Sequence, residues 1–277
     1  MIFNKFFILF KIGRKIGKSN IINIVSETHK IPIFIKLFFN LLAFSFSSSN
    51  NTKSKSRENL SESIQEMGTT FIKLGQFLAT RPDIIGEKLS KELESLQDKL
   101  PPFSKKKAEK IIIENLGQSN FDDIIDLSEP IAAASIAQVH KAKIKEDNII
   151  KKVAIKVLRP NIKKIFNDEI DAIMLLAYIV ESLISKTKRL KLIEVVFLFK
   201  EITNHEMDLR FEAAAANEYA ENTKNDLGFL VPKIYWNFTS ESVLTLDWVD
   251  GISIREKDLL KEKNIETSKI ATNLIQH

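Results

Sequence analysis

The stretch that decides the fold runs from Pro130 to Pro160 and reads PIAAASIAQVHKAKIKEDNIIKKVAIKVLRP. Its two apolar runs flank a short polar turn at residues 145–148. Along the second run, bulky apolar residues alternate with Ala154 and Lys156. Alternation with a period of two is typical of a β-strand, because successive side chains point to opposite faces of a sheet. The stretch therefore predicts two paired strands joined by a tight turn.

The sequence on either side of this hairpin is expected to add helices and a second pair of strands. Apolar residues recur every three or four positions through 58–100, and long helices are expected at 162–184 and 190–222. Segments 231–238 and 242–246 are predicted to pair as strands. Only 8 glycines and 7 prolines among 277 residues favour helices over a turn-rich β protein. The expected fold class is α+β, a small mixed sheet with a helix packed on it.

Lys156, in the strand sequence VAIK, is the first candidate for chemistry. Protein kinases use such a lysine to hold the α- and β-phosphates of ATP, and a helix carboxylate is its partner. The segment NHEMDLRFEAAAANEY offers Asp208 and Glu212, which are four residues apart and share one helix face. Glu206 lies on the other side of an ideal helix. The alternatives are an exposed lysine at the edge of a sheet and an ordinary charged helix face.

Five motifs follow one another along the chain: KLGQ at 73–76, PIAAASIAQVHKA at 130–142, VAIKVLRP at 153–160, EMD at 206–208 followed by EAAAAN, and LDWVDGI at 246–252. In this order they resemble the ubiquinone-biosynthesis (UbiB-type) family of atypical kinases, and the match extends from about residue 58 to the end. The resemblance implies a protein-kinase-like N-terminal lobe with a helical N-terminal extension.

The resemblance also implies roles for individual residues. The K-x-G-Q helix is implied to lie over the active site and to regulate it through Lys73, Gly75 and Gln76, and Lys73 is implied to meet Glu206 and Asp208. An alanine loop replaces the glycine-rich loop of ordinary kinases, which biases the nucleotide preference and suppresses protein phosphorylation. One departure is that the family's E-A-A-N pattern reads EAAA from Glu212 onward. The residues implied to bind ATP are Ala132, Ala133, Ala134, Ser135, Lys156 and Glu212.

The catalytic loop and the Mg²⁺-binding aspartate of a kinase are expected to be missing from this chain. Phosphoryl transfer needs both, and in kinase order they follow the connector that ends near Asp250. The 27 residues after Asp250 hold one aspartate, Asp258, and no H-x-D or D-F-G. His205–Asp208 and the Asp-Leu-Gly at 226–228 imitate these motifs in the wrong order. The chain alone is therefore expected to have no catalytic residue, no metal ligand and no activity, unless a second polypeptide supplies the other lobe.

The expected organisation is a basic, apolar segment with a linker at 1–57, a helical extension at 58–128, a kinase-like lobe at 129–250 and the start of a truncated second lobe at 251–277. Segment 1–57 carries ten Lys/Arg and one acid, a balance of +9, whereas the rest carries 31 basic and 35 acidic residues, a balance of −4. A nucleic-acid protein would carry the basic face on the folded domain, so nucleic acid is not an expected partner.

The expected partners are ATP or ADP, an anionic membrane surface bound by the basic apolar segment, and ubiquinone-biosynthesis proteins. The expected location is the cytoplasmic face of the inner membrane, as a peripheral protein, or the cytoplasm. With no cysteine and four histidines, a Cys/His zinc site is excluded. Two alternatives stay open at this point: a non-catalytic, membrane-associated interaction module, and a helical protein that matches the motifs by chance.

Overall fold

The computed structural model describes most of the chain and divides it into two compact units. The expected linker at residues 45–57 lies outside the described residues. The described residues are 2–18, 60–96, 100–183, 185–226, 228–254 and 256–276. The helical unit comprises residues 1–100, 134–136 and 161–204, and the sheet unit comprises residues 101–133, 137–160 and 205–277.

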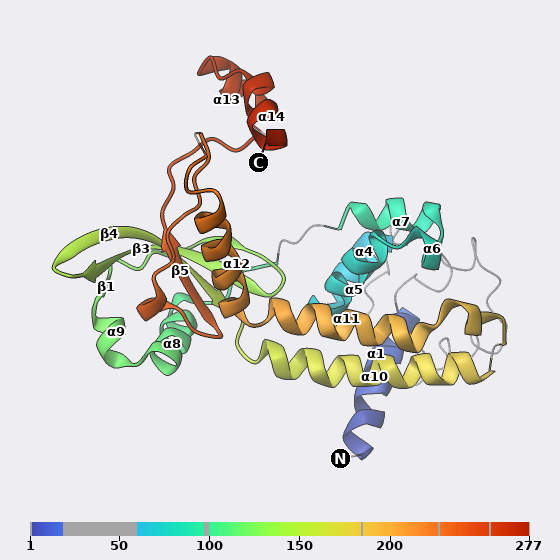
Figure 1. The fold of residues 1–277 in the computed structure, drawn as a ribbon. Coiled ribbons are helices and arrows are strands. Elements are labelled where there is room, and N and C mark those ends of the chain that lie inside the picture. The colour runs from blue at the N-terminus through green and yellow to red at the C-terminus, as the bar shows by residue number, and fades with distance from the viewer. Residues whose placement is uncertain are drawn as a thin grey trace, which may run out of the picture. The chain divides into compact units, whose positions relative to one another are not determined.

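The helical unit is built on a pair of long helices. The predicted helix at 162–184 is confirmed as α10, and it lies alongside α11 (Figure 1). Phe166 of α10 and Phe199 of α11 are buried and meet edge to face, with ring centroids 5.5 Å apart. The elements of this unit are α1 (Ile2–Lys18), α4 (Leu60–Met67), α5 (Thr69–Ala79), α6 (Pro82–Ile85), α7 (Glu87–Glu94), α10 (Ile162–Leu183), η1 (Ser185–Leu190) and α11 (Leu192–Glu206), whose last two residues belong to the sheet unit.

The sheet unit confirms the predicted α+β class. Five strands form one sheet in which every pairing is antiparallel (Figure 1). The strand order is β1-β3-β4-β5, and β2 also pairs with β3. The elements are α8 (Lys105–Leu116), α9 (Gln118–Asp122), β1 (Ile124–Ile125), β2 (Pro130–Ala133), β3 (Ala137–Glu146), β4 (Ile149–Leu158), α12 (Leu209–Asn222), η2 (Trp236–Phe238), β5 (Val243–Asp247), α13 (Lys257–Glu262) and α14 (Thr267–Gln276).

The alternation along 153–157 sets the two faces of the sheet. Val153, Ile155 and Val157 are fully buried and pack with Ala108 and Ile112 of α8 in one apolar cluster. Each such side chain stabilises the fold by about 1.5–3 kcal/mol relative to its exposed state. Because side chains alternate across a strand, Lys156 leaves β4 on the face away from α8. The core thus orients the strand that carries the candidate lysine.

The β3–β4 hairpin is confirmed, and its turn lies within the predicted polar segment. Asp147 and Asn148 have φ values of 50° and 62°, the left-handed conformation that a two-residue turn of type I′ requires. Asparagine and aspartate tolerate this conformation better than other residues with a β-carbon. Gln138 pairs with Val157 and Val139 with Lys156, so the register fixes which residues of β3 flank the lysine.

Three details of the predicted topology are wrong. The sheet is antiparallel and not mixed: β3 and β4 form a hairpin, and β5 pairs antiparallel with β4 although α10, η1, α11 and α12 lie between them in the sequence. The run 131–144 holds two strands, β2 and β3, with a reversal at 134–136. The segment 231–238 is not a strand. Pro232 has no N–H to donate to a strand ladder, and within this segment only Ile234 forms a bridge, to Leu246. The segment ends in the 3₁₀ helix η2.

Candidate functional site

Lys156 occupies the centre of the sheet and is held by a carboxylate. Its strand β4 lies between β3 and β5, so the alternative of an edge lysine does not apply. The Nζ atom donates to Glu212 Oε2 at 2.7 Å and to Oε1 at 3.0 Å. Both residues belong to the sheet unit, and Glu212 projects from the first turn of α12. The ion pair joins the helix to the sheet and fixes the position of the ammonium group.

The remaining hydrogen-bonding capacity of Lys156 fits an anion. A lysine ammonium has three N–H donors, and Glu212 takes two of them. The side chain of Lys156 is 27% exposed and that of Glu212 is 49% exposed, so the group is within reach of a ligand in solvent. One donor on a positioned cation, next to a solvent-accessible face, suits a phosphate oxygen.

α12 begins at Asp208, which is the residue that breaks the helix predicted at 190–222. Asp208 is extended, with φ −122° and ψ 98°, and its carboxylate accepts a bond from Arg210 N. Aspartate is a preferred N-cap because its side chain satisfies a backbone donor at the helix start. The Arg210 guanidinium also donates two bonds to Asp208, at 2.9 and 2.6 Å. The break separates Asp208 from the helix of Glu206, so the helical-wheel argument that related the two residues was wrong.

The KLGQ helix and the carboxylates predicted to meet it belong to different units. Lys73, Gly75 and Gln76 lie on α5 in the helical unit, whereas Glu206 and Asp208 belong to the sheet unit. The meeting of Lys73 with these carboxylates therefore stays a prediction. Gly75 has a packing explanation within its own unit, because a β-carbon there would overlap Leu96 Cδ1 and lie 3.4 Å from Ile64 Cγ2.

The alanine loop is also divided. Ala132 and Ala133 end β2 in the sheet unit, and Ala134 and Ser135 belong to the helical unit. None of the four residues has a positive φ, so the loop takes its conformation without needing glycine. Within the helical unit, Thr69 Oγ1 donates to the Ser135 carbonyl at 3.3 Å. Thr69 is the first residue of α5, the helix that carries KLGQ.

The segment LDWVDGI is anchored on the sheet by contacts that the sequence did not indicate. Trp248 N donates to the Lys152 carbonyl, and the Lys141 ammonium lies 4.2 Å from the centre of the Trp248 ring. A cation over an indole face is favourable by about 0.5–1 kcal/mol at an exposed site. The Tyr235 hydroxyl donates to Asp247 Oδ1 at 2.5 Å. These contacts fix the chain where it leaves β5.

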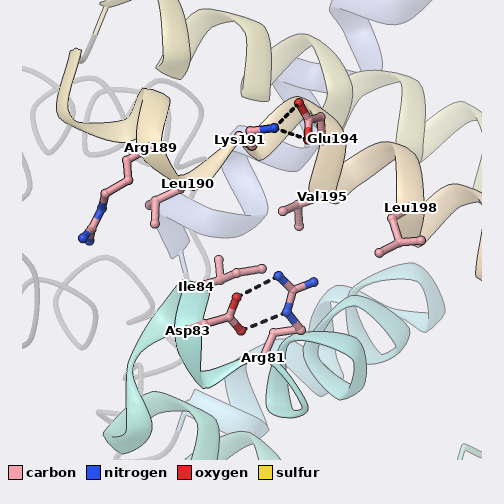
Figure 2. Close-up of a pocket in the computed structure, with 9 residues that line it drawn as sticks. All are labelled: Arg81, Asp83, Ile84, Arg189, Leu190, Lys191, Glu194, Val195 and Leu198. Carbon is pink, nitrogen blue, oxygen red and sulfur yellow. Dashed lines mark hydrogen bonds and ion pairs between the residues drawn. The ribbon is translucent and has the colours of Figure 1, made fainter.

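A pocket of about 430 Å³ lies in the helical unit, between α6 and the junction of η1 with α11 (Figure 2). Charged residues that line the pocket pair with one another: Arg81 donates to Asp83 at 2.9 and 2.7 Å, and Lys191 donates to Glu194 at 2.9 Å. The hydrogen bond from Arg81 lowers the pKa of Asp83, which stays ionised and neutralises the guanidinium. Lys156 therefore remains the better candidate for an anion. The lining residues are Arg81, Asp83, Ile84, Arg189, Leu190, Lys191, Glu194, Val195 and Leu198.

The antiparallel sheet, the central lysine and the carboxylate of a packed helix define the N-terminal lobe of a protein-kinase-like fold. Residues 95–277 match the ABC1 atypical kinase-like domain. The chain belongs to this family. The expectation of a UbiB-like atypical kinase is thereby confirmed at the level of the family.

Several curated proteins that the chain resembles carry the name probable protein kinase UbiB. The one from Marinobacter nauticus is 32% identical over 243 residues, which are 87% of this chain and 44% of that protein. The one from Pseudomonas paraeruginosa is 30% identical over 265 residues, which are 95% of this chain and 49% of that protein. The one from Cellvibrio japonicus is 32% identical over 242 residues. The chain thus spans about half the length of the curated relatives it matches.

Proposed function

We propose that this chain is the nucleotide-binding half of an atypical kinase or ATPase that supports ubiquinone biosynthesis. In this proposal Lys156 contacts the α- and β-phosphates of ATP, Glu212 holds the lysine in place, and the alanine loop at 132–135 covers the phosphates. The observation that carries the proposal is the bidentate ion pair between Lys156 and Glu212 on the central strand. Family membership supports it, because kinases place the same pair at the phosphates.

The residues present fit the phosphate end of a nucleotide but not its metal. The ammonium of Lys156 supplies a positioned donor, and Ala132 is exposed, so that its backbone can approach a ligand. Mg²⁺, when bound, would neutralise phosphate charge, and it requires carboxylate ligands. Within the described residues, no group of three or more His, Asp or Glu side chains gathers that could hold a metal. We therefore propose that this chain binds nucleotide through Lys156 and that hydrolysis requires metal ligands other than those that the described residues provide.

Nucleotide binding by the 277-residue chain tests the proposal directly. Titration of a fluorescent ATP analogue should give saturable binding that unlabelled ATP or ADP displaces. Omission of Mg²⁺ should weaken binding little, because the proposed contacts do not pass through the metal. Absence of binding to the folded chain at millimolar ATP, or binding whose affinity is unchanged by substitution of Lys156, would reject the nucleotide role.

A second candidate function, attachment to an anionic membrane surface, is favoured by one feature of α1. The helix contacts α10 and its Ile12 is buried, while Phe7 is 68% exposed and Phe10 is 37% exposed. Lys11 is exposed on the same side of the helix. Apolar rings beside cations suit the interface of an anionic bilayer. Among the described residues, no helix is long and apolar enough to cross a membrane.

Vesicle flotation separates this second candidate from the first. The chain should float with vesicles that contain anionic lipid and not with neutral ones, and Phe7→Ser should reduce flotation. Phe197→Ser is the matched control, because Phe197 is also exposed but lies on α11. Equal flotation of both variants would exclude α1 as the attachment element. The expected location at the cytoplasmic face of the inner membrane depends on this result.

A further inference from the structure

Two fully buried polar side chains stand on β3 immediately after the alanine loop. Gln138 and His140 are each 0% exposed, and they share the face of β3 because they are two residues apart. In the ladder with β2, Gln138 is opposite Ala133 and His140 is opposite Pro130. Buried polar groups cost free energy unless they are hydrogen-bonded, so their partners show what they hold in place.

The bonds of Gln138 fix the orientation of its amide and the protonation of its neighbour. Phe103 N donates to Gln138 Oε1 at 2.9 Å, and Gln138 Nε2 donates to the Phe103 carbonyl at 3.1 Å. Because a backbone N–H can only donate, Oε1 must face Phe103 N. The amide nitrogen then faces His140 Nε2 at 2.8 Å and donates to it. His140 Nε2 is therefore an acceptor without a proton, and the proton of the neutral ring is on Nδ1.

His140 uses that proton to hold the chain that enters the alanine loop. Nδ1–H donates to the Ser128 carbonyl at 2.8 Å, two residues before β2 begins. The ladder is weak at this point, because Pro130 has no N–H and the register shifts between Pro130 and Ala132. The remaining anchors are the bonds of Ser128 to Lys141, at 2.8 and 2.9 Å. The His140 bond is thus a large part of what fixes the start of β2.

We propose that Gln138 and His140 are positioning residues for residues 128–133, the segment that leads into the alanine loop and is called its incoming arm here. They hold this arm in the conformation that receives nucleotide, and they do so only while the His140 ring is neutral. This inference rests on the nucleotide-binding function proposed above. It adds a buried control point that sets how firmly the arm is held, and this point lies beside the register position of Lys156 but on the opposite face of the sheet. In a protonated ring Nε2 also carries a hydrogen, so it would face the N–H donor of the Gln138 amide. If the amide flipped to present its oxygen to the ring, its NH₂ group would face the N–H of Phe103 instead.

The surroundings of His140 agree with a neutral ring. Burial lowers its pKa, and this effect exceeds the opposing one of the hydrogen bond to Ser128. Among the charged groups that face the ring, Glu129 and Glu109 raise the pKa and Lys105 lowers it. The folded pKa lies below the unfolded one, so the stabilisation is complete above about pH 6.5 and is lost as the pH falls through the folded value.

Two substitutions test the hydrogen bonds of the two ring nitrogens of His140 separately. His140→Asn keeps a donor near the position of Nδ1, whereas His140→Gln keeps an acceptor near the position of Nε2 and loses the bond to Ser128. In the full 277-residue chain, His140→Gln should speed amide hydrogen exchange in β2 about tenfold, as loss of one buried hydrogen bond implies. His140→Asn should leave β2 close to wild type. Affinity for a fluorescent ATP analogue should follow the same order.

The pH dependence provides a test that needs no variant. Lowering the pH from about 7.5 to about 5.5, on either side of the ordinary histidine pKa, should reduce the protection of β2 relative to the β3–β4 pair, after correction for intrinsic exchange. Equal protection of β2 in both variants, or a ratio that does not change with pH, would overturn the inference. Protection that responds as expected, in a wild-type chain that binds no ATP analogue, would retain the positioning role and reject the nucleotide function.

Discussion

Lys156 Nζ lies 2.7 Å from Glu212 Oε2, and this ion pair is partly exposed rather than buried. A partly exposed pair contributes about 0–1 kcal/mol to stability, because solvent screens the attraction and two long side chains lose freedom. The pair also joins residues 56 positions apart in the sequence, on a central strand and a helix. A contact that contributes little to stability yet places a cation on an interior strand is what the proposed nucleotide-binding role requires.

Lys156→Met should therefore separate function from stability. We expect affinity for an ATP analogue to fall at least about tenfold, because charge-assisted hydrogen bonds to phosphate are lost. The thermal midpoint should change little. Lys200→Met is the matched control, since Lys200 forms a similarly exposed pair with Asp171 at 3.6 Å in the helical unit. Calorimetric titration and a thermal scan of both variants provide the measurements, and a similar loss of affinity in the control would contradict the assignment.

The hairpin and the lysine strand could be predicted because the alternation of apolar residues at 153–157 specifies both the strand and its faces. The reversal at 134–136 could not, since the turn is formed by alanine, serine and isoleucine without glycine or proline. The helix break at Asp208 was missed because the residues around it favour helix, and only the capping bonds of its carboxylate reveal it. Periodicity cannot show such local hydrogen bonds.

In the candidate site, too, some features could be predicted from the sequence and others only from the fold. Kinase chemistry predicted a helix carboxylate beside Lys156 and left Asp208 and Glu212 as candidates; the family resemblance favoured Glu212, which is bonded to Lys156 in the structure. The buried Gln138 and His140 carried one signal in the sequence, two polar residues two apart in an apolar strand, but the partners that explain them come from distant positions such as Phe103. Non-local hydrogen bonds of this kind require the fold itself.

Gly75 allows a test of the packing of the KLGQ helix. Gly75→Ala gains about 1 kcal/mol of helix propensity, but its β-carbon would overlap Leu96 Cδ1, and overpacking costs about 1–3 kcal/mol. Because Leu96 Cδ1 is the free end of a side chain that can shift, we expect the substitution to be less favourable in the wild-type background than in a Leu96→Ala background. In a Leu96→Ala background the overlap is absent, and the same substitution should stabilise the protein. Urea unfolding of the four proteins in this cycle measures the coupling, and additivity of the two substitutions would refute the contact.

Gly117, between α8 and α9, should be required for its backbone conformation alone. It has φ 83° and ψ 161°, a region that glycine occupies almost exclusively. A β-carbon there would meet no atom within 4 Å, so a steric contact cannot contribute. Gly117→Ala should cost about 1–3 kcal/mol. Gly251→Ala is the control, because Gly251 also has open space around it but no positive φ, and its cost should stay within about 0.5 kcal/mol. Equal midpoints for the two variants in thermal unfolding would argue against the backbone explanation.

The hydrogen bond of Tyr235 should stabilise the sheet unit, and this stabilisation should be lost at alkaline pH. The side chain is buried and its hydroxyl donates to Asp247, so Tyr235→Phe should cost about 1.5–3 kcal/mol near neutral pH, as expected for a hydrogen bond to a charged group. Tyr178→Phe, at an exposed position of α10, is the control and should have little effect.

Burial, and then the hydrogen bond to Asp247, raise the pKa of Tyr235 well above its ordinary value. The protonated form is therefore favoured in the folded state, and its stabilisation is complete below the unfolded pKa of about 10 and is lost as the pH rises further. The difference in unfolding free energy between wild type and Tyr235→Phe should narrow above about pH 10, because only the wild type has this proton to lose. Urea unfolding at intervals across that range measures the narrowing. A difference that stayed constant would mean that the Tyr235 hydroxyl ionises as readily in the folded chain as in the unfolded one, and that its bond to Asp247 does not hold the proton.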